Sequence, residues 1–169
     1  MSAIGTWVAM TNDILVDGDN ILSFIAGETI YAGQVVGFAA TGADHTVVVM
    51  DQTALEHAVG VALYNATVGQ YLAVASLGCI CNIANGSDSL TIDAGDWVQQ
   101  SAATAKGMVD VFTARDALSA TTIDVSNDTT IDGSAYLVGL ALDDITASSN
   151  GRVLIMPYLL LYSDHAVVT

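Results

Sequence analysis

The sequence is a succession of short β-forming runs separated by turn-forming residues. Runs rich in Val, Ile, Thr, Ala and Tyr alternate with clusters of Gly, Asp and Asn, and the chain contains 15 glycines but one proline. This pattern predicts strands at residues 21–25, 34–39, 46–50, 59–63, 71–75, 78–83, 97–100, 108–113, 137–142 and 152–158. Strands so short and closely spaced favour an all-β fold, a small β-barrel or sandwich, over alternating strands and helices. One short helical candidate, residues 51–58, does not change that class.

Three short segments recur in the same order along the chain, which predicts an internally duplicated strand set. Residues 26–30 reappear as 94–98, residues 60–63 as 139–142, and residues 69–74 as 151–156. The repeat halves are then about 26–83 and 94–162, within one β-barrel domain at 21–169 that follows an N-terminal arm at 1–20. The matched segments lie farther apart in the second half, which places one inserted loop or hairpin at about 114–132. A duplicated strand set that closes on itself would hide the exposed edges of both halves.

Charge excludes one large class of function. The chain carries a formal net charge of −15, and its only fixed cations are Lys106, Arg115 and Arg152. A DNA or RNA binder neutralises phosphates with clustered Lys and Arg, so we expect no nucleic-acid partner. Intrinsic disorder is excluded as well, because 53% of the residues are hydrophobic and only 12% are charged.

The acidic residues are almost all aspartates: Glu28 and Glu56 are the only glutamates, and Lys106 is the only lysine. Two interpretations fit. Aspartate is common in the turns of all-β proteins, because its side chain bonds the local backbone. A halophilic protein instead keeps a hydrated acidic surface whose self-repulsion is screened by salt, and this interpretation also accounts for the scarcity of lysine.

The uncharged stretch between Glu56 and Asp88 raises the question of a membrane span. Glycines and polar residues interrupt it, among them Gly60, Asn65 and Gly69, and no basic residues flank it. A transmembrane helix needs about 20 predominantly apolar residues, so we expect strands that cross a core, and no membrane partner. The first residues show no basic segment followed by an apolar core, so no secretory signal is expected.

The residue types that usually carry chemistry do not form a recognisable site. Cys79 and Cys81 lie on one face of an expected strand, but no second cysteine or histidine pair completes a zinc site, so a buried, reduced pair is expected. His45, His57 and His165 lack a serine in a G-x-S-x-G turn or a cysteine in a recognisable nucleophile setting. We therefore expect no catalytic residue, no cofactor and no enzymatic activity.

Aspartate-rich turns are the remaining candidates for a metal site. The segment 17–20 and the pair Asp143-Asp144 offer oxygen ligands to a hard cation, but the first lacks the later glutamate of a calcium-binding loop. Solvated turns are the simpler interpretation, and weak binding of a divalent ion, Na⁺ or K⁺ is the alternative. No metal-binding residue is assigned.

Both ends of the chain carry candidate contact residues. Trp7 lies in a stretch without strand periodicity, and tryptophan is enriched at the centres of interfaces, so it either belongs to a contact arm or packs on its own barrel. Residues 157–162 are more apolar than an exposed tail should be, which an edge strand covered by a neighbouring subunit would explain. The candidate contacts with a partner or a neighbouring subunit are Trp7, Tyr158, Leu160 and Tyr162.

The first half of the chain carries a family resemblance. The segments 26–30 (Ala-Gly-Glu-x-Ile), 33–37 (Gly-Gln-Val-Val-Gly), 58–62 (Ala-Val-Gly-Val-Ala) and 68–71 (Val-Gly-Gln-Tyr) resemble those of the small capsid-decoration, or capsid cement, proteins of tailed phages and related archaeal viruses. The resemblance covers roughly residues 18–162 through short glycine-based motifs. It implies a mainly β-barrel protein without catalytic residues that binds the major capsid protein outside the shell, often as a trimer at three-fold sites. The insertion at 114–132 and the acidity depart from the family pattern.

The sequence therefore predicts a structural virion protein that binds the outer capsid surface as a homotrimer and stabilises the shell. Another virion part, such as a turret, tail-tube or major capsid component, is the first alternative. A surface carbohydrate-binding β module is the second. Its signature is exposed aromatic residues in a groove, and the aromatic content of 7% does not favour it.

Overall fold

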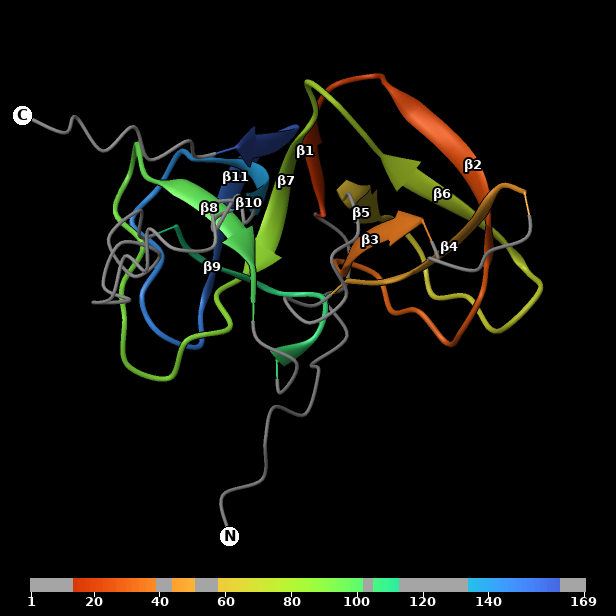
Figure 1. Ribbon diagram of the computed structural model, residues 1–169, viewed down its shortest axis with the longest axis horizontal. Coiled ribbons are helices and arrows are strands. Elements are labelled where there is room, and N and C mark those ends of the chain that lie inside the picture. Colours follow the sequence, from red (N-terminus) through yellow and green to blue (C-terminus); the bar gives the residue numbers. More distant parts are fainter. Residues whose placement is uncertain (1–13, 39–43, 51–57, 102–104, 113–133, 162–169) are drawn as a thin grey trace, which may run out of the picture.

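The computed structural model describes residues 14–38, 44–50, 58–101, 105–112 and 134–161, and in these ranges the chain is all-β, as predicted (Figure 1). Each predicted strand segment overlaps a strand, while residues 51–57 of the helical candidate lie outside the described residues. No helix in the described part is long and apolar enough to cross a membrane. The strands are β1 (Leu15–Asp17), β2 (Ile21–Ala26), β3 (Val35–Phe38), β4 (Thr46–Val49), β5 (Ala58–Ala62), β6 (Tyr71–Ala75), β7 (Ile80–Ala84), β8 (Trp97–Gln100), β9 (Val109–Val111), β10 (Ser134–Ala141) and β11 (Asn150–Leu161).

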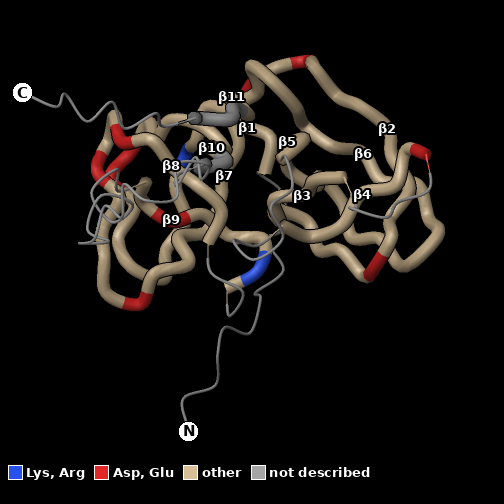
Figure 2. The backbone as a smooth tube through the Cα atoms, in the orientation of Figure 1, with Lys and Arg blue, Asp and Glu red and all other residues tan. Residues whose placement is uncertain are grey.

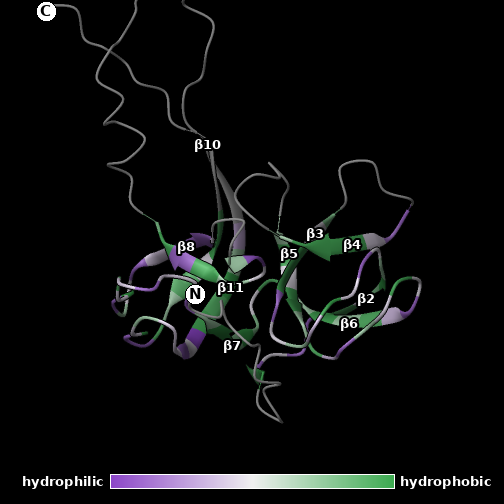
Figure 3. Cartoon of the chain, turned by 90° about the horizontal axis from the view of Figure 1, so that it is seen from below, coloured by the Kyte–Doolittle hydropathy of each residue, from purple (hydrophilic) through white to green (hydrophobic). Residues whose placement is uncertain are grey.

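The first half of the chain forms a closed five-stranded barrel in the order β2-β4-β3-β5-β6. β2 closes the barrel, because it pairs antiparallel with β6 and parallel with β4. The strands are mostly hydrophobic and the connections between them more hydrophilic (Figure 3). Along each strand, successive side chains point to opposite faces of the sheet. The inward-facing side chains form the core of this barrel: Phe24, Ala26, Ile30, Val36, Val47, Val49, Ala62, Ala66, Leu72 and Val74.

The second half repeats this arrangement in a six-stranded sheet with the order β1-β7-β11-β10-β8-β9. Its strands β7-β11-β10-β8-β9 pair in the order that β2-β6-β5-β3-β4 have in the barrel. The sheet curls toward closure at the corresponding place, where Asn85 bridges Val109 in parallel. The N–H of Gly86 donates to the Val109 carbonyl at 2.8 Å, as the N–H of Gly27 donates to the Val47 carbonyl at 2.8 Å.

The same backbone hydrogen bonds recur in the two halves, so the predicted duplication of the strand set is confirmed. Gly33 and Gly95 each donate an N–H across the turn that precedes a strand, to the carbonyls of Ala62 and Ala141 at 2.7 and 2.8 Å. The residue before this turn also exchanges two backbone bonds with a second connection in each repeat, Ile30 with Ala66 of the β5–β6 connection and Ile92 with Ile145 of the β10–β11 connection.

The structural correspondence of the repeats differs from the sequence match at two of the three segments. Gly60 corresponds to Gly139, as the sequence match proposes. Gly95, however, corresponds to Gly33 and not to Gly27, because these two residues make the same turn. Gly69 corresponds to Ser148, not to Gly151: both precede a strand in the left-handed conformation, with φ of 82° and 56°.

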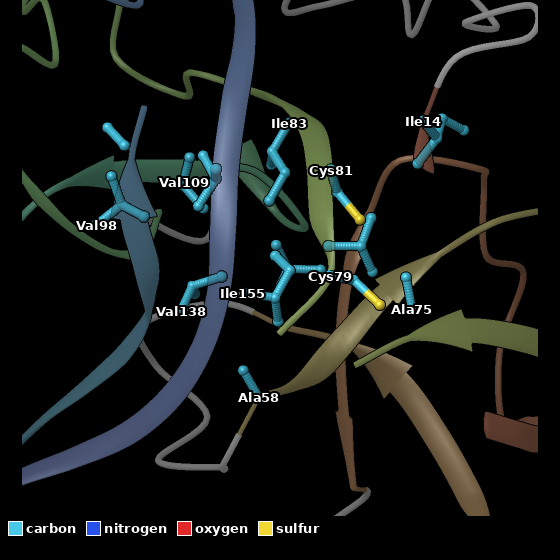
Figure 4. Close-up of a cluster of buried hydrophobic side chains, with 14 of the residues drawn as sticks. Ile14, Ala58, Ala75, Cys79, Cys81, Ile83, Val98, Val109, Val138 and Ile155 are labelled. Atoms are coloured by element: carbon cyan, nitrogen blue, oxygen red, sulfur yellow. The ribbon is translucent and has the colours of Figure 1, made fainter. Parts of the chain in front are cut away.

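A second buried cluster fills the second repeat and joins it to the first. It contains Cys79 and Ile155 of the second repeat together with Val61 and Ala75, which point out of the first barrel. Figure 4 shows Ala75 next to Cys79, with side chains of both repeats in one cluster. A continuous core therefore holds the two repeats together.

β1 is a strand that the sequence pattern did not predict. Leu15 pairs with Cys81 and Asp17 with Ile80 of β7, and Ile14 is buried in the second cluster. These residues fall within the segment 1–20 that was expected to form an arm. Residues 1–13 lie outside the described residues, as does the expected insertion at 114–132.

Candidate functional site

The cysteine pair is buried. Cys79 and Cys81 are free thiols without solvent exposure, as expected of a buried, reduced pair. Burial, together with the nearby Cys79, raises the pKa of the Cys81 thiol to about 12. Cys79 donates its S–H to the Asn20 carbonyl, with Sγ 3.6 Å from the oxygen. The thiolate is the form that attacks substrates and binds metals, so this raised pKa disfavours the reactive form of Cys81 at neutral pH.

Aspartates of the aspartate-rich turns accept hydrogen bonds from other groups of the protein. Asp143 accepts two hydrogen bonds from the Arg152 side chain, at 2.6 and 2.8 Å, and these bonds lower the pKa of Asp143 to about 2. Asp144 accepts the N–H of Ala94 at 2.9 Å, and Asp17 accepts that of Gly18. Among the described residues, no group of three His, Cys, Asp or Glu side chains is placed to hold a metal ion.

The two repeats differ in their side chains at one end of the first barrel and at the corresponding end of the second sheet. In the first repeat, the β2–β3 and β5–β6 connections meet there, and in the second the β7–β8 and β10–β11 connections do. Both ends use one pattern of side-chain bonds to backbone N–H groups, so corresponding side chains can be compared directly. The bonds are Tyr31 N–H to Gln34 Oε1 at 2.8 Å and Ala32 N–H to Asn65 Oδ1 at 2.8 Å in the first repeat, and Asp93 N–H to Asp96 Oδ2 at 3.0 Å and Ala94 N–H to Asp144 Oδ1 at 2.9 Å in the second.

In the first repeat the exposed positions to be compared at this end are uncharged and mostly aromatic. Tyr31, Tyr64 and Tyr71 are exposed, the last two to 66% and 80%, and Val68 is exposed in the β5–β6 connection. Tyr31 and Tyr64 are carried by two segments that the Ile30–Ala66 bridge holds side by side. We call Tyr31, Tyr64, Val68 and Tyr71 the tyrosine end.

In the second repeat the same positions are acidic or polar. Asp93 stands at the position of Tyr31, Asp143 at that of Tyr64, and Asn150 at that of Tyr71. Figure 2 shows acidic positions gathered around the loops of this repeat. Ionised carboxylates are costly to remove from water, so this end is suited to face solvent.

Exposed tyrosines at one end of a strongly acidic chain are suited to contact another molecule. Tyrosine offers a large contact area with few rotatable bonds, and its hydroxyl can hydrogen-bond at a wet interface. Grouped exposed apolar side chains on a protein surface mark an interaction site more often than single ones do. The tyrosine end is therefore the candidate interaction surface.

None of the contact residues predicted from the sequence is among the four residues of the tyrosine end. Trp7 and Tyr162 fall outside the described residues. Tyr158 and Leu160 lie in β11, where they pair with Leu137 and Ala135 of β10. This hairpin is longer than that of β5 and β6, and its added part has the apolar sequence Tyr-Leu-Leu-Leu at 158–161. The contact role of these residues remains a prediction.

Sequence reasoning did not single out Tyr31, Tyr64 or Tyr71. The signal that could have found them is the comparison of the two repeats. Aligning Gly27 with Gly95 hid the contrast of Tyr31 with Asp93, which only the Gly33–Gly95 correspondence shows. The match of Gly60 with Gly139 already places Tyr64 opposite Asp143.

No protein-family model and no curated protein matches the sequence. Among solved structures, the chain is similar to the crystal structure of the head fiber gp8.5 N base in bacteriophage phi29, with a TM-score of 0.46 and 12% sequence identity. The similarity covers 84% of this chain and 98% of that chain. Likeness at this level indicates no function, so the proposals below rest on the residues of the chain itself.

Proposed function

We propose that this chain is a structural virion protein that binds the outer surface of a viral capsid through its tyrosine end and stabilises the shell as a homotrimer. The observation that carries the proposal is the divergence of the two repeats. The second repeat keeps a solvated acidic end, whereas the first has exposed Tyr31, Tyr64 and Tyr71 at the same positions. One contact end and one solvated end suit a protein that sits on a surface.

Two further observations support a structural role without enzymatic activity. The segments 26–30, 33–37, 58–62 and 68–71 resemble those of capsid-decoration proteins. In the part of the chain that the structure describes, the thiols are buried, and Asp143 and Asp144 are bonded to the protein's own groups. The proposal therefore includes no catalytic residue and no cofactor.

In this proposal each copy bridges neighbouring subunits of the major capsid protein and opposes their separation. Specific protein interfaces bury roughly 1,000 Å² or more. Because the protein would bind the assembled shell and not its separated subunits, it shifts the equilibrium toward the intact shell by mass action. Repetition over the lattice multiplies this contribution.

Co-sedimentation with purified capsids tests the contact. The double variant Tyr31→Asp/Tyr64→Asp gives the first repeat the residues that the second repeat carries on the same turns, so the fold should tolerate it. We expect it to bind capsids at least about tenfold more weakly, because interface aromatics carry much of the binding energy. Leu90→Asp, at an exposed apolar residue of the second repeat, is the control and should bind like the wild type. Equal binding by all three proteins would overturn the assignment of the contact.

Mass spectrometry of purified virions, with copy-number determination, tests the role. Decoration of the shell predicts many copies, in a fixed ratio to the major capsid protein, whereas a turret or tail-tube component predicts fewer copies at particular places. Antibody labelling of intact virions tests the outer location. Absence from the virion would overturn the proposal.

A surface carbohydrate-binding module is the second candidate function, and the exposed tyrosines favour it because sugar rings stack on aromatic side chains. Titration with a panel of glycans, monitored by intrinsic fluorescence, separates the two functions. Saturable glycan binding that the Tyr31→Asp/Tyr64→Asp variant loses, without any capsid binding by the wild type, would favour this second function.

A further inference from the structure

The second repeat completely covers one face of the first. Met50, Val35, Val61 and Ala75 lie side by side on this face, because Val35 pairs with Val61, Val61 pairs with Ala75, and the N–H of Met50 donates to the Val35 carbonyl at 3.0 Å. Their side chains point away from the interior of the first barrel. All four are fully buried in the cluster that the two repeats share.

Backbone bonds also join the second repeat to this face. Gly107 donates its N–H to the Met50 carbonyl at 2.7 Å and accepts the N–H of Val35 at 2.8 Å. The neighbouring Lys106 forms an ion pair with Glu28 at 2.8 Å. Within one chain, therefore, one copy of the repeat covers this face of the other.

The second repeat has a corresponding row of side chains. Trp97 pairs with Leu140, Leu140 pairs with Leu154, and the N–H of Phe112 donates to the Trp97 carbonyl at 2.8 Å. We call these four residues the outer row; they stand at the positions of Val35, Val61, Ala75 and Met50. Trp97 is 40% exposed, and the other three are half-buried.

We propose that the outer row is the surface through which this chain binds a second copy of itself. The inference deepens the homotrimer of the proposed function and rests on that part of it. The internal repeat is the reason for choosing a second copy as the partner. On the first repeat, the corresponding face is covered by the second repeat, which has the same fold. Trp97, Leu140 and Leu154 are also larger than the residues they replace. They would therefore lose more water-exposed apolar area when a copy docks.

Charge sets the conditions for this docking. Each chain has a net charge of −15. Asp96 precedes Trp97 at one side of the outer row, and Asp17 pairs with Ile80, the neighbour of Leu154, at the other. Two copies therefore repel each other at low ionic strength. At 1 M salt the Debye length falls to about 3 Å, so we expect assembly to strengthen with salt.

Light scattering coupled to size-exclusion chromatography in molar NaCl tests the surface. The wild type should have three times the 17.4 kDa chain mass. Trp97→Gln and Leu140→Gln should each weaken the assembly about thirtyfold, while Leu90→Gln, the control at another exposed leucine, should not. A monomeric wild type would overturn both the surface and the trimer, whereas capsid binding is measured separately. Variants that stay trimeric at wild-type affinity would overturn the surface alone.

A fluorescence measurement tests the same surface without changing it. The tryptophans of the chain are Trp7 and Trp97, so Trp7→Phe leaves Trp97 as the reporter. We expect its emission to move to shorter wavelength as the protein concentration rises through the assembly range, because docking removes the ring from water. Blue-shifted emission already present in the dilute monomer would show that another part of the same chain covers Trp97, and would overturn the proposal. Unchanged emission in the trimer would also overturn it.

Discussion

Gly60 and Gly139 occupy the same position in the two repeats, and the same close approach requires both. A Cβ added to Gly60 would lie 2.0 Å from the Ala75 carbonyl oxygen, and one added to Gly139 would lie 2.0 Å from that of Leu154. The obstructing atom belongs to the backbone of the neighbouring strand and cannot rotate away. Any larger residue would push the paired strands apart.

Gly60→Ala should therefore lower the free energy of unfolding by about 3 kcal/mol, the upper part of the usual range for overpacking. Denaturant unfolding followed by circular dichroism measures it. Gly69→Asn is the matched control, since a Cβ there has nothing within 4 Å and asparagine tolerates the φ of 82°. If the two variants unfold at the same denaturant concentration, β5 and β6 do not approach as closely as described.

Strands bounded by turn-forming residues were predictable from the sequence, and strands that depend on a distant partner were not. β6 and β8 have the predicted bounds, 71–75 and 97–100, because turns with glycine at 69 and 95 precede them. β1 has only three residues, and it forms because β7 offers an edge about 65 residues farther along the chain. No local pattern carries that information.

The register of the duplication, and with it the candidate site, was only partly predictable. A turn that needs a positive φ usually carries glycine, so glycines guide a match between repeats. Ser148 adopts such a φ although it is not a glycine. The sequence match therefore aligned Gly69 with Gly151, whereas the structure aligns it with Ser148. The buried cysteine pair needed only the alternation of a strand and was predicted. The contrast of Tyr31 with Asp93 needed the correct register and was missed.

Two N-terminal deletions test where the folded unit begins. Deletion of residues 1–12 should leave the β-type circular dichroism spectrum and the thermal midpoint unchanged while weakening capsid binding, as expected if Trp7 is a contact. Deletion of residues 1–19 also removes Ile14 from the core and β1 from the edge of β7. We expect it to cost about 2–4 kcal/mol, as loss of a large buried side chain does. Equal thermal midpoints for the two shortened proteins would mean that β1 contributes nothing to stability.

In the whole molecule, a continuous apolar core stabilises the folded state, and a large net negative charge destabilises it. The buried cluster that includes Val61 and Ile155 spans both repeats, so we expect the chain to unfold as one cooperative unit. The surface opposes this cohesion, because a net charge of −15 is carried on 169 residues. In the described part, the ion pairs Lys106–Glu28 and Arg152–Asp143 offset only a small share of it.

Salt should therefore stabilise the folded protein, as the halophilic interpretation of the sequence requires. Screening weakens the repulsion among surface carboxylates, which the compact state suffers more than the unfolded chain does. A relief of about 2 kcal/mol would raise the thermal midpoint by roughly 4–8 °C between low and molar NaCl.

The midpoints must be measured at one protein concentration, since assembly also stabilises the folded protein. KCl should act like NaCl, and the variant Asp88→Asn/Asp93→Asn, which removes two exposed carboxylates, should show a smaller rise. A midpoint that does not respond to salt would leave the fold as described. The aspartates would then be explained by their place in turns.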